Sequence, residues 1–328
     1  MPFMQTRVGI VVLDGFTDSG LGVALDVLRS ANALSQRTGK RAPFVIEVLT
    51  PSADLRVRAA SGLVTQTQGP LARLSRCDLV LIAGTWMEGP DGVDALLARK
   101  DARQVIAALD RAAARGATIG ASCAGTFLLA ATGRLDGRPA TTTWWLAESF
   151  RSHFPAVEID VEQTLTTSGR LLCAGTVFAM ADLALTLVSR LAGPALARHC
   201  MRVLLLDRHA SQAPYMVLRD LVREEPLVQA AERWVRHHLT EDVSVDRLAR
   251  AVGASPRTLA RRLATKLGTT PLGFIHRIRL EAATHLLESS KQSLDEVAEA
   301  VGYRDAGTLR RLIRRKLGAT PRELRNST

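Results

Sequence analysis

Hydrophobic positions in the first two thirds of the chain alternate between continuous runs and helical spacing. The run Val8–Leu13 is almost wholly apolar, as in a strand buried on both faces. In Leu21–Leu34 apolar residues recur every three or four positions, the period of an amphipathic helix. The same alternation predicts strands at Phe44–Leu49, Leu79–Ile82, Ala117–Ala121, Val157–Val161 and Leu171–Cys173, and helices at Ala102–Ala114, Ala179–Leu191 and Ala195–Leu205. It indicates an α/β domain whose mainly parallel sheet is sandwiched by helices.

The pattern changes after Leu206. The following residues include His209, Ser211 and Pro214, which interrupt the helical spacing. Beyond them only helical patterns occur. We therefore expect an α/β domain at 7–206, a linker at 207–225 and an all-α domain at 226–325.

The all-α segment contains an internal repeat. Leu248–Gly253 recurs as Val297–Gly302, and each copy is followed by a turn and a basic helix. A glycine permits the sharp turn, Ser255 is a good N-cap, and Gly268 and Gly318 can end the basic helices. The repeat predicts two helix-turn-helix units, with basic helices at Ser255–Lys266 and about Ala306–Lys316.

The basic helices carry candidate contacts to the major groove of double-stranded DNA. Arginine donates paired hydrogen bonds to guanine, and Lys or Arg further along a helix contacts phosphate. For the base-facing surface we select Arg257, Ala260, Arg261, Ala306, Gly307, Arg310 and Arg311, and for phosphate Lys266, Arg314, Arg315 and Lys316. A single arginine here would be interpreted as a solvated charge, but the repeated arrangement favours DNA recognition.

Charge is distributed in the same sense. From Pro226 onward there are 19 Lys and Arg against 11 Asp and Glu, whereas the preceding part has 24 against 21. The excess predicts that the C-terminal domain meets a polyanion. Neither an N-terminal signal pattern nor a run of eighteen apolar residues occurs, so we expect a cytoplasmic protein with no membrane contact. Four scattered cysteines without a CxxC pair predict no disulfide, metal or cofactor.

The clearest local motif of the first domain is Ile119–Phe127, a strand that passes through small residues into a helix. This pattern places Cys123 at a nucleophile-elbow position, where the following helix N-terminus would favour a thiolate. The alternative is a small buried cysteine at a strand end. The pattern alone leaves both interpretations open.

The C-terminal region resembles the AraC-type DNA-binding domain over nearly its whole length. The resemblance rests on Leu248–Gly253 with Ser255–Leu259, on Arg277–Leu287, and on Val297–Arg325. It implies that a central helix, here about Pro271–Glu288, joins two units that enter adjacent major-groove segments. Two positions depart from the family pattern: Arg304-Asp305 replaces small polar residues, and Leu312-Ile313 stands where Phe is common.

Residues 7 to about 205 resemble the class I glutamine-amidotransferase-like, PfpI-like sensor domain of the GlxA-like regulators. The matching motifs are Leu13–Phe16, Ser61–Leu63, Ser122–Gly125, Leu135–Thr142, Trp144, Phe154-Pro155, Ala174-Gly175, Asp182–Leu185 and Gln212. The resemblance implies a flavodoxin-like sheet and a homodimer that senses a small-molecule effector and acts with RNA polymerase. Amino acids or quaternary amines are the effectors that it suggests.

Departures from this second pattern bear on catalysis. Thr143 stands where relatives place a histidine, and Ser19-Gly20 where they place an acid. His153 is interpreted as a surface residue and Trp145 as a core residue. We therefore expect no enzyme, and a ligand pocket at the carboxyl ends of the strands formed by Asp14, Gly84, Thr85, Cys123, Ala124, Thr143, Trp144 and Thr176. The alternatives are an active cysteine amidase or hydratase, or a redox-responsive regulator, each using Cys123.

Overall fold

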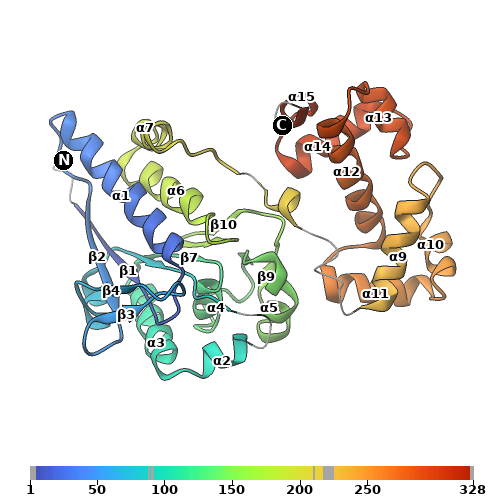
Figure 1. The fold of residues 1–328 in the computed structure, drawn as a ribbon. Helices are drawn as coiled ribbons and strands as arrows, with labels where there is room; N and C mark the ends of the chain where they lie inside the picture. Colours follow the sequence, from blue (N-terminus) through green and yellow to red (C-terminus); the bar gives the residue numbers. More distant parts are fainter. Residues whose placement is uncertain (1–4, 88, 90–91, 210, 217–224, 326–328) are drawn as a thin grey trace. The chain divides into compact units, whose positions relative to one another are not determined.

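The computed structural model describes residues 5–87, 89, 92–209, 211–216 and 225–325 (Figure 1). The chain forms two compact units, residues 1–209 and 210–328. Each unit has its own hydrophobic clusters, and each is described by itself.

The N-terminal unit is built on a mainly parallel sheet. Its strands, in spatial order, are β10 (Leu165–Ser168), β11 (Leu171–Ala174), β7 (Thr118–Ser122), β6 (Leu79–Ile82), β1 (Thr6–Val11), β2 (Phe44–Thr50) and β5 (Gly69–Pro70). Only β10 and β11 pair antiparallel; the other neighbours are parallel, with Val8 of β1 opposite Ile46 of β2 and Leu79 of β6. The order β2-β1-β6-β7-β11 is the flavodoxin-like order, which confirms the predicted fold class.

Helices cover both faces of this sheet because successive strand residues point to opposite sides. In β6, Leu79 and Leu81 join one core, and Val80 and Ile82 join the other. The first core includes residues of α1 (Asp18–Arg37), α6 (Met180–Ala192) and α7 (Pro194–Leu204). The second includes residues of α2 (Gly92–Ala98), α3 (Lys100–Ala114), α4 (Gly125–Ala130), α5 (Ala147–His153) and the 3-10 helix η1 (Leu71–Arg76).

Some details of the strands differ from expectation. Within Val157–Val161 only β9 (Glu158–Ile159) is a strand, and it pairs with β8 (Pro139–Ala140) outside the main sheet. The edge strand β10 and the hairpin of β3 (Arg56–Arg58) with β4 (Val64–Gln66) were not expected. These strands are short, and most of their residues are partly or fully exposed, so they lack the apolar runs that mark a doubly covered strand.

The described helices of the C-terminal unit form two cores that share one helix. The elements are η3 (Ala213–Tyr215), α9 (Pro226–His237), α10 (Val245–Ala251), α11 (Pro256–Leu267), α12 (Pro271–Ser289), α13 (Leu294–Ala300), α14 (Ala306–Leu317) and α15 (Pro321–Arg325). Phe274, Ile275 and Ile278 of α12 pack with α9–α11. Leu280 and Leu287 pack with α13–α15. Figure 1 shows α12 running between these two groups, and the all-α prediction is confirmed.

The two basic helices begin and end through local hydrogen bonds. The Ser255 hydroxyl accepts the Thr258 N–H at 3.1 Å, and the Asp305 carboxylate accepts the Thr308 N–H at 2.7 Å. Asp305 therefore caps α14, which gives the unusual residue at this turn a structural reason. Gly268 and Gly318 end the helices in the left-handed region, as predicted.

Neither the cysteines nor the helices of the described residues indicate a disulfide, a metal site or a membrane span. The four cysteines are buried free thiols. Among the described residues, no group of three or more His, Cys, Asp or Glu side chains could hold a metal ion. None of the helices in these ranges is long and apolar enough to cross a membrane.

Leu183 gives a direct test of the core. Its side chain is fully buried between α6 and the sheet, where it lies against Gly120. Leu183→Ala should lower the free energy of unfolding by about 2–5 kcal/mol, because the deletion leaves a cavity. Leu191→Ala, on the same helix but 37% exposed, should cost much less. Urea unfolding of the full chain, followed by tryptophan fluorescence, measures both; equal losses would contradict the packing.

Candidate DNA-binding interface and effector pocket

The first basic helix, α11, separates apolar from basic side chains. Leu259, Leu263 and Leu267 are buried in the first core of the C-terminal unit. Arg257 and Arg261, one turn apart, are exposed, and Ala260 is half-buried. The apolar stripe therefore fixes the helix, and the arginines remain on its outer surface.

The second basic helix, α14, repeats this arrangement. Leu309, Leu312 and Ile313 are buried in the second core, so aliphatic side chains fill the position where the family pattern has Phe. The exposed residues are Arg310, Arg311, Arg314 and Arg315, whereas Gly307 and Lys316 are half-buried. Ala306 is only 8% exposed and belongs to the second core. Its side chain thus contributes to packing rather than to the outer face.

The arginines on these surfaces are largely free of acidic partners. Among the described residues, no ion pair within 4.0 Å involves Arg257, Arg261, Arg310, Arg311, Arg314 or Arg315. Arg311 donates to the Thr308 hydroxyl at 2.9 Å, and that hydroxyl donates to Asp305 at 2.8 Å. This chain of bonds orients one guanidinium and leaves the helix surface cationic.

Glu225 modifies this surface in a way that the sequence did not indicate. Its carboxylate lies 3.7 Å from Nη1 of Arg262 and 3.9 Å from Nζ of Lys266. Lys266 was predicted to contact phosphate, and a phosphate there must compete with Glu225. Glu225 directly precedes α9, whereas Arg262 and Lys266 lie on α11, so no local sequence pattern could have revealed these ion pairs.

Cys123 occupies a strained elbow between β7 and α4. Its φ is +52°, a conformation that costs energy for any residue with a Cβ. Its N–H donates to the Ala174 carbonyl at 3.0 Å, and its carbonyl accepts the Thr142 hydroxyl at 2.8 Å. A Cβ on Gly84 would lie 2.8 Å from Cβ of Cys123, so glycine is needed for this close approach. The geometry matches the predicted elbow.

The Cys123 thiol does not have the ionisation that the motif suggested. Burial raises its pKa to about 11, although the Ala124 N–H and the Thr143 side chain act in the opposite direction. The helix N-terminus is therefore present, but desolvation outweighs it. At neutral pH the group is a thiol, which favours the second of the two interpretations, a small buried cysteine at a strand end.

Three buried hydroxyls are associated with the elbow: those of Ser122 and Thr126 lie near Cys123 in the sequence, and that of Thr143 lies near its thiol. Ser122, Thr126 and Thr143 are fully buried, and among the described residues their oxygens have no hydrogen-bond partner except the Cys123 thiol, which the Thr143 side chain contacts. Thr143 is near enough to the Cys123 thiol to influence its pKa. A buried hydroxyl without a hydrogen bond lowers the stability of the fold. These hydroxyls are therefore suited to form hydrogen bonds with a small polar molecule.

The remaining predicted pocket residues differ in their engagement. Asp14 is exposed; its carboxylate accepts the Arg58 N–H and its carbonyl accepts the Arg99 guanidinium, both at 2.8 Å. Thr85 is buried in a bridge with Phe16, and Thr176 is half-buried after β11. The contacts thus bring Gly84, Ala124 and Thr143 to Cys123, while Asp14 is held by other partners.

The aromatic residues near the elbow are divided between core and surface. Trp144 begins the 3-10 helix η2 (Trp144–Leu146), is buried, and meets Trp145 edge-on with centroids 5.2 Å apart. Trp145 is 44% exposed, so its interpretation as a core residue is wrong.

To act as a base for Cys123, His153 would need a ring nitrogen free to accept a proton. Its Nε2 lies 2.9 Å from Asp94, and its Nδ1 lies 2.7 Å from the Ser149 carbonyl. The hydrogen bond to Asp94 raises its pKa. Both ring nitrogens thus have partners other than Cys123.

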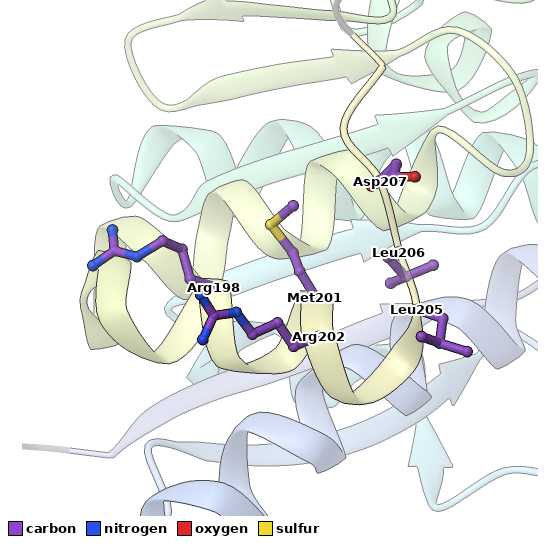
Figure 2. Close-up of a pocket in the computed structure, with 6 residues that line it drawn as sticks. All are labelled: Arg198, Met201, Arg202, Leu205, Leu206 and Asp207. Atoms are coloured by element: carbon purple, nitrogen blue, oxygen red, sulfur yellow. The ribbon is translucent and has the colours of Figure 1, made fainter. Parts of the chain in front are cut away.

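A separate groove lies along α7 and the segment that follows it. It has a volume of about 490 Å³ and is lined by Arg198, Met201, Arg202, Leu205, Leu206 and Asp207. Figure 2 shows Arg198 and Arg202 extending from the helix, with Leu205 to Asp207 on the chain that leaves it. None of the residues selected from the sequence lines this groove.

Alkylation rates test the ionisation of Cys123. Because its pKa is raised to about 11, roughly one thiol in ten thousand is ionised at pH 7, and each pH unit up to the pKa increases that fraction tenfold. Iodoacetamide labelling of the native chain, followed by peptide mass spectrometry, should be slow at neutral pH and accelerate above pH 9. Chain unfolded in urea is the control; equal rates for the native and unfolded chains at pH 7.5 would contradict the burial.

Known proteins resemble this chain in both parts. Residues 248–327 match the family model for a helix-turn-helix domain. The HTH-type transcriptional regulator GbdR of Pseudomonas aeruginosa is 27% identical over 322 residues, which cover 97% of this chain and 83% of GbdR. The similarity thus extends through both units.

Two solved structures show a similar fold. An AraC family transcriptional regulator from Pseudomonas putida is 25% identical with a TM-score of 0.52, covering 61% of this chain and 99% of that chain. A THiJ/PfpI family protein from Pseudomonas syringae is 20% identical with a TM-score of 0.51, covering 63% and 78%. Both alignments are longer than the C-terminal unit, so they include much of the α/β unit. The chain is therefore similar over both units to AraC-type transcription regulators, with an α/β domain of PfpI-like fold before a helix-turn-helix domain.

Proposed function

We propose that this AraC-type regulator recognises specific DNA by placing α11 and α14 in adjacent segments of the major groove. The observation that carries the proposal is the repeated pair of capped helices, each with a buried aliphatic stripe and exposed arginines. Major-groove recognition uses such helices.

Individual roles follow from exposure. Arg257, Arg261, Arg310 and Arg311 are assigned to base edges, with Ala260 and Gly307 allowing close approach. Arg314, Arg315, Lys266 and Lys316 are assigned to phosphates, and Lys266 must exchange Glu225 for a phosphate. Ala306 supports the second core.

Substitution of one arginine in each helix tests this interface. Arg261→Ala and Arg311→Ala should each weaken specific binding roughly 5- to 150-fold, because each removes a contact to a base. The probe is a duplex selected from a random library with the full chain, and binding is measured by fluorescence anisotropy over a range of salt concentrations. Wild-type affinity should fall steeply with salt.

Arg29→Ala is the matched control, since Arg29 is exposed on α1 of the other unit. Its affinity should equal that of wild type. Failure to select any duplex, or equal losses in Arg29→Ala and the helix variants, would reject the assignment of α11 and α14.

We also infer that the N-terminal unit senses a small metabolite at the Cys123 elbow rather than turning one over. The support is chemical: the thiol is buried and neutral, His153 is engaged elsewhere, and the buried Thr143 hydroxyl has no hydrogen-bond partner other than the Cys123 thiol in the described part of the chain. The catalytic set is thus incomplete for a cysteine hydrolase. Amino acids and quaternary amines are the first effectors to examine, with Trp144 beside Thr143 as the aromatic contact.

The same thiol argues against the two alternatives for Cys123. An amidase or hydratase needs an ionised nucleophile, and peroxide oxidises thiolates in preference to thiols. We further propose that the protein acts in the cytoplasm as a homodimer and works with RNA polymerase, as its resemblance to AraC-type regulators implies.

Thr143→Val tests the effector site, because it removes the hydroxyl and preserves the shape. A thermal-shift screen of metabolites against the full chain should find a ligand that raises the melting temperature of wild type by mass action. The shift should be lost or much reduced in Thr143→Val and unchanged in Thr38→Val, at an exposed threonine after α1. A ligand that stabilises all three proteins equally would place the effector site elsewhere.

A further inference from the structure

The two helix-turn-helix units of the C-terminal domain have separate cores joined through α12. The first core uses the N-terminal half of that helix, and the second uses its C-terminal half. Two units joined by one helix can twist or bend relative to each other unless further contacts restrain them. The distance between α11 and α14 along a duplex therefore depends on what restrains them.

Arg279, in the middle of α12, makes such a contact. Its side chain is buried, and Nη2 donates to the carbonyls of Leu239 at 3.1 Å and Glu241 at 2.7 Å. Both carbonyls lie between α9 and α10, in the first helix-turn-helix unit of the C-terminal domain. The guanidinium also lies over the ring of Tyr303, which belongs to the second helix-turn-helix unit, and its carbon is 5.6 Å from the ring centroid. One buried cation thus contacts both units.

The charge of Arg279 makes this arrangement specific. Among the described residues no acidic side chain forms an ion pair with it. Two carbonyl dipoles at Nη2 and an aromatic face replace part of the water that the guanidinium has lost, whereas its buried Nε has no hydrogen-bond partner among the described residues. A planar group can satisfy all three only in one orientation, so displacement of either unit would leave a buried charge with fewer partners.

Gly302 brings the same two segments into direct contact. It lies in the turn before α14 with φ +80°, and a Cβ there would lie 2.0 Å from the Leu239 carbonyl oxygen and 2.7 Å from Nη2 of Arg279. No side chain fits. The turn that leads into the second basic helix therefore rests on the loop after α9.

Tyr303 is itself held from α12. Its hydroxyl lies 3.0 Å from Nδ1 of His276, and the two rings are nearly parallel. Burial lowers the pKa of His276 and raises that of Tyr303 to about 12, so both groups are neutral at pH 7 and can share a hydrogen bond. The ring under the guanidinium is thereby fixed.

We propose that Arg279 is a positioning residue that sets the spacing between the two DNA segments recognised by α11 and α14. It acts through the Leu239 and Glu241 carbonyls, Tyr303 and Gly302, and contacts no DNA itself. The inference rests on the proposed function, in which both helices engage one duplex. It assigns a specificity role to a side chain that lies away from the basic surface.

The experiment measures spacing preference with the full chain. A duplex is selected from a random library with wild type, and footprinting locates its two contacted segments. Companion duplexes carry one base pair inserted or deleted between them. Arg279→Met should bind the selected duplex about tenfold more weakly, because hydrogen bonds to a charged group are lost. It should also lose most of the wild-type preference for the selected spacing over the altered spacings.

Arg236→Met is the control, because Arg236 forms ion pairs with Glu232 and with Glu281 of the shared helix α12, but among the described residues it makes no hydrogen bond or ion pair with the turn before α14. It can lower stability, yet its preference for the selected spacing should match wild type. Circular dichroism verifies folding, and if Arg279→Met does not fold, Arg279→Lys, which keeps the charge but not the planar stack, is measured instead.

An unchanged spacing ratio in the Arg279 variant, whatever its affinity, would overturn the inference while leaving DNA binding intact. An equal loss of spacing preference in Arg236→Met would also overturn it, since any destabilisation would then suffice. Failure of wild type to select any duplex would instead reject the proposed function.

Discussion

Burial of the α12 helix is the constraint on which the C-terminal unit depends. Its apolar side chains supply part of two cores, and each core fixes one basic helix by an aliphatic stripe. Among the described residues, the exposed arginines of α11 and α14 have few partners, such as Glu225 for Arg262 and Thr308 for Arg311. Their placement is therefore a consequence of packing on the opposite side, and the basic surface exists because the apolar surface is complete.

The N-terminal unit follows a different logic. Its sheet is covered on both faces, so strands such as β1 and β6 contribute to two cores, and the loops at the carboxyl ends of the strands can accept strain. Cys123 takes that strain at the end of β7, with Gly84 making room beside it. The fold retains the shape of a nucleophile elbow, but burial has removed the ionisation that a nucleophile needs. The backbone shape of the elbow is thus present without the ionised thiol that nucleophilic catalysis needs.

Much of this organisation could be predicted from the sequence. Strands covered on both faces were visible as apolar runs, and the basic helices were bounded by Ser255 and the two C-terminal glycines because caps are local. The edge strand β10 was missed because three of its four residues are polar. The two interpretations of Cys123 stayed open because a helix terminus can be recognised locally, whereas desolvation arises from the packing of distant elements.

The site also contains partners that no pattern could supply. Glu225 meets Arg262 and Lys266 from another element, and Arg279 meets carbonyls whose position depends on the tertiary fold. Main-chain acceptors leave no trace in the sequence. Trp145 likewise has an aromatic side chain suited to a core, and only its neighbours determine that it faces solvent.

The caps of the two basic helices differ in one respect that the repeat conceals. Ser255 is neutral, whereas Asp305 places a carboxylate at the start of α14. A helix N-terminus attracts anions, so the first helix offers an open positive end and the second has already neutralised its own. The duplication therefore preserves the fold but not the electrostatic symmetry. A duplex that meets both units encounters two unequal ends, and the complex has an intrinsic direction along the DNA.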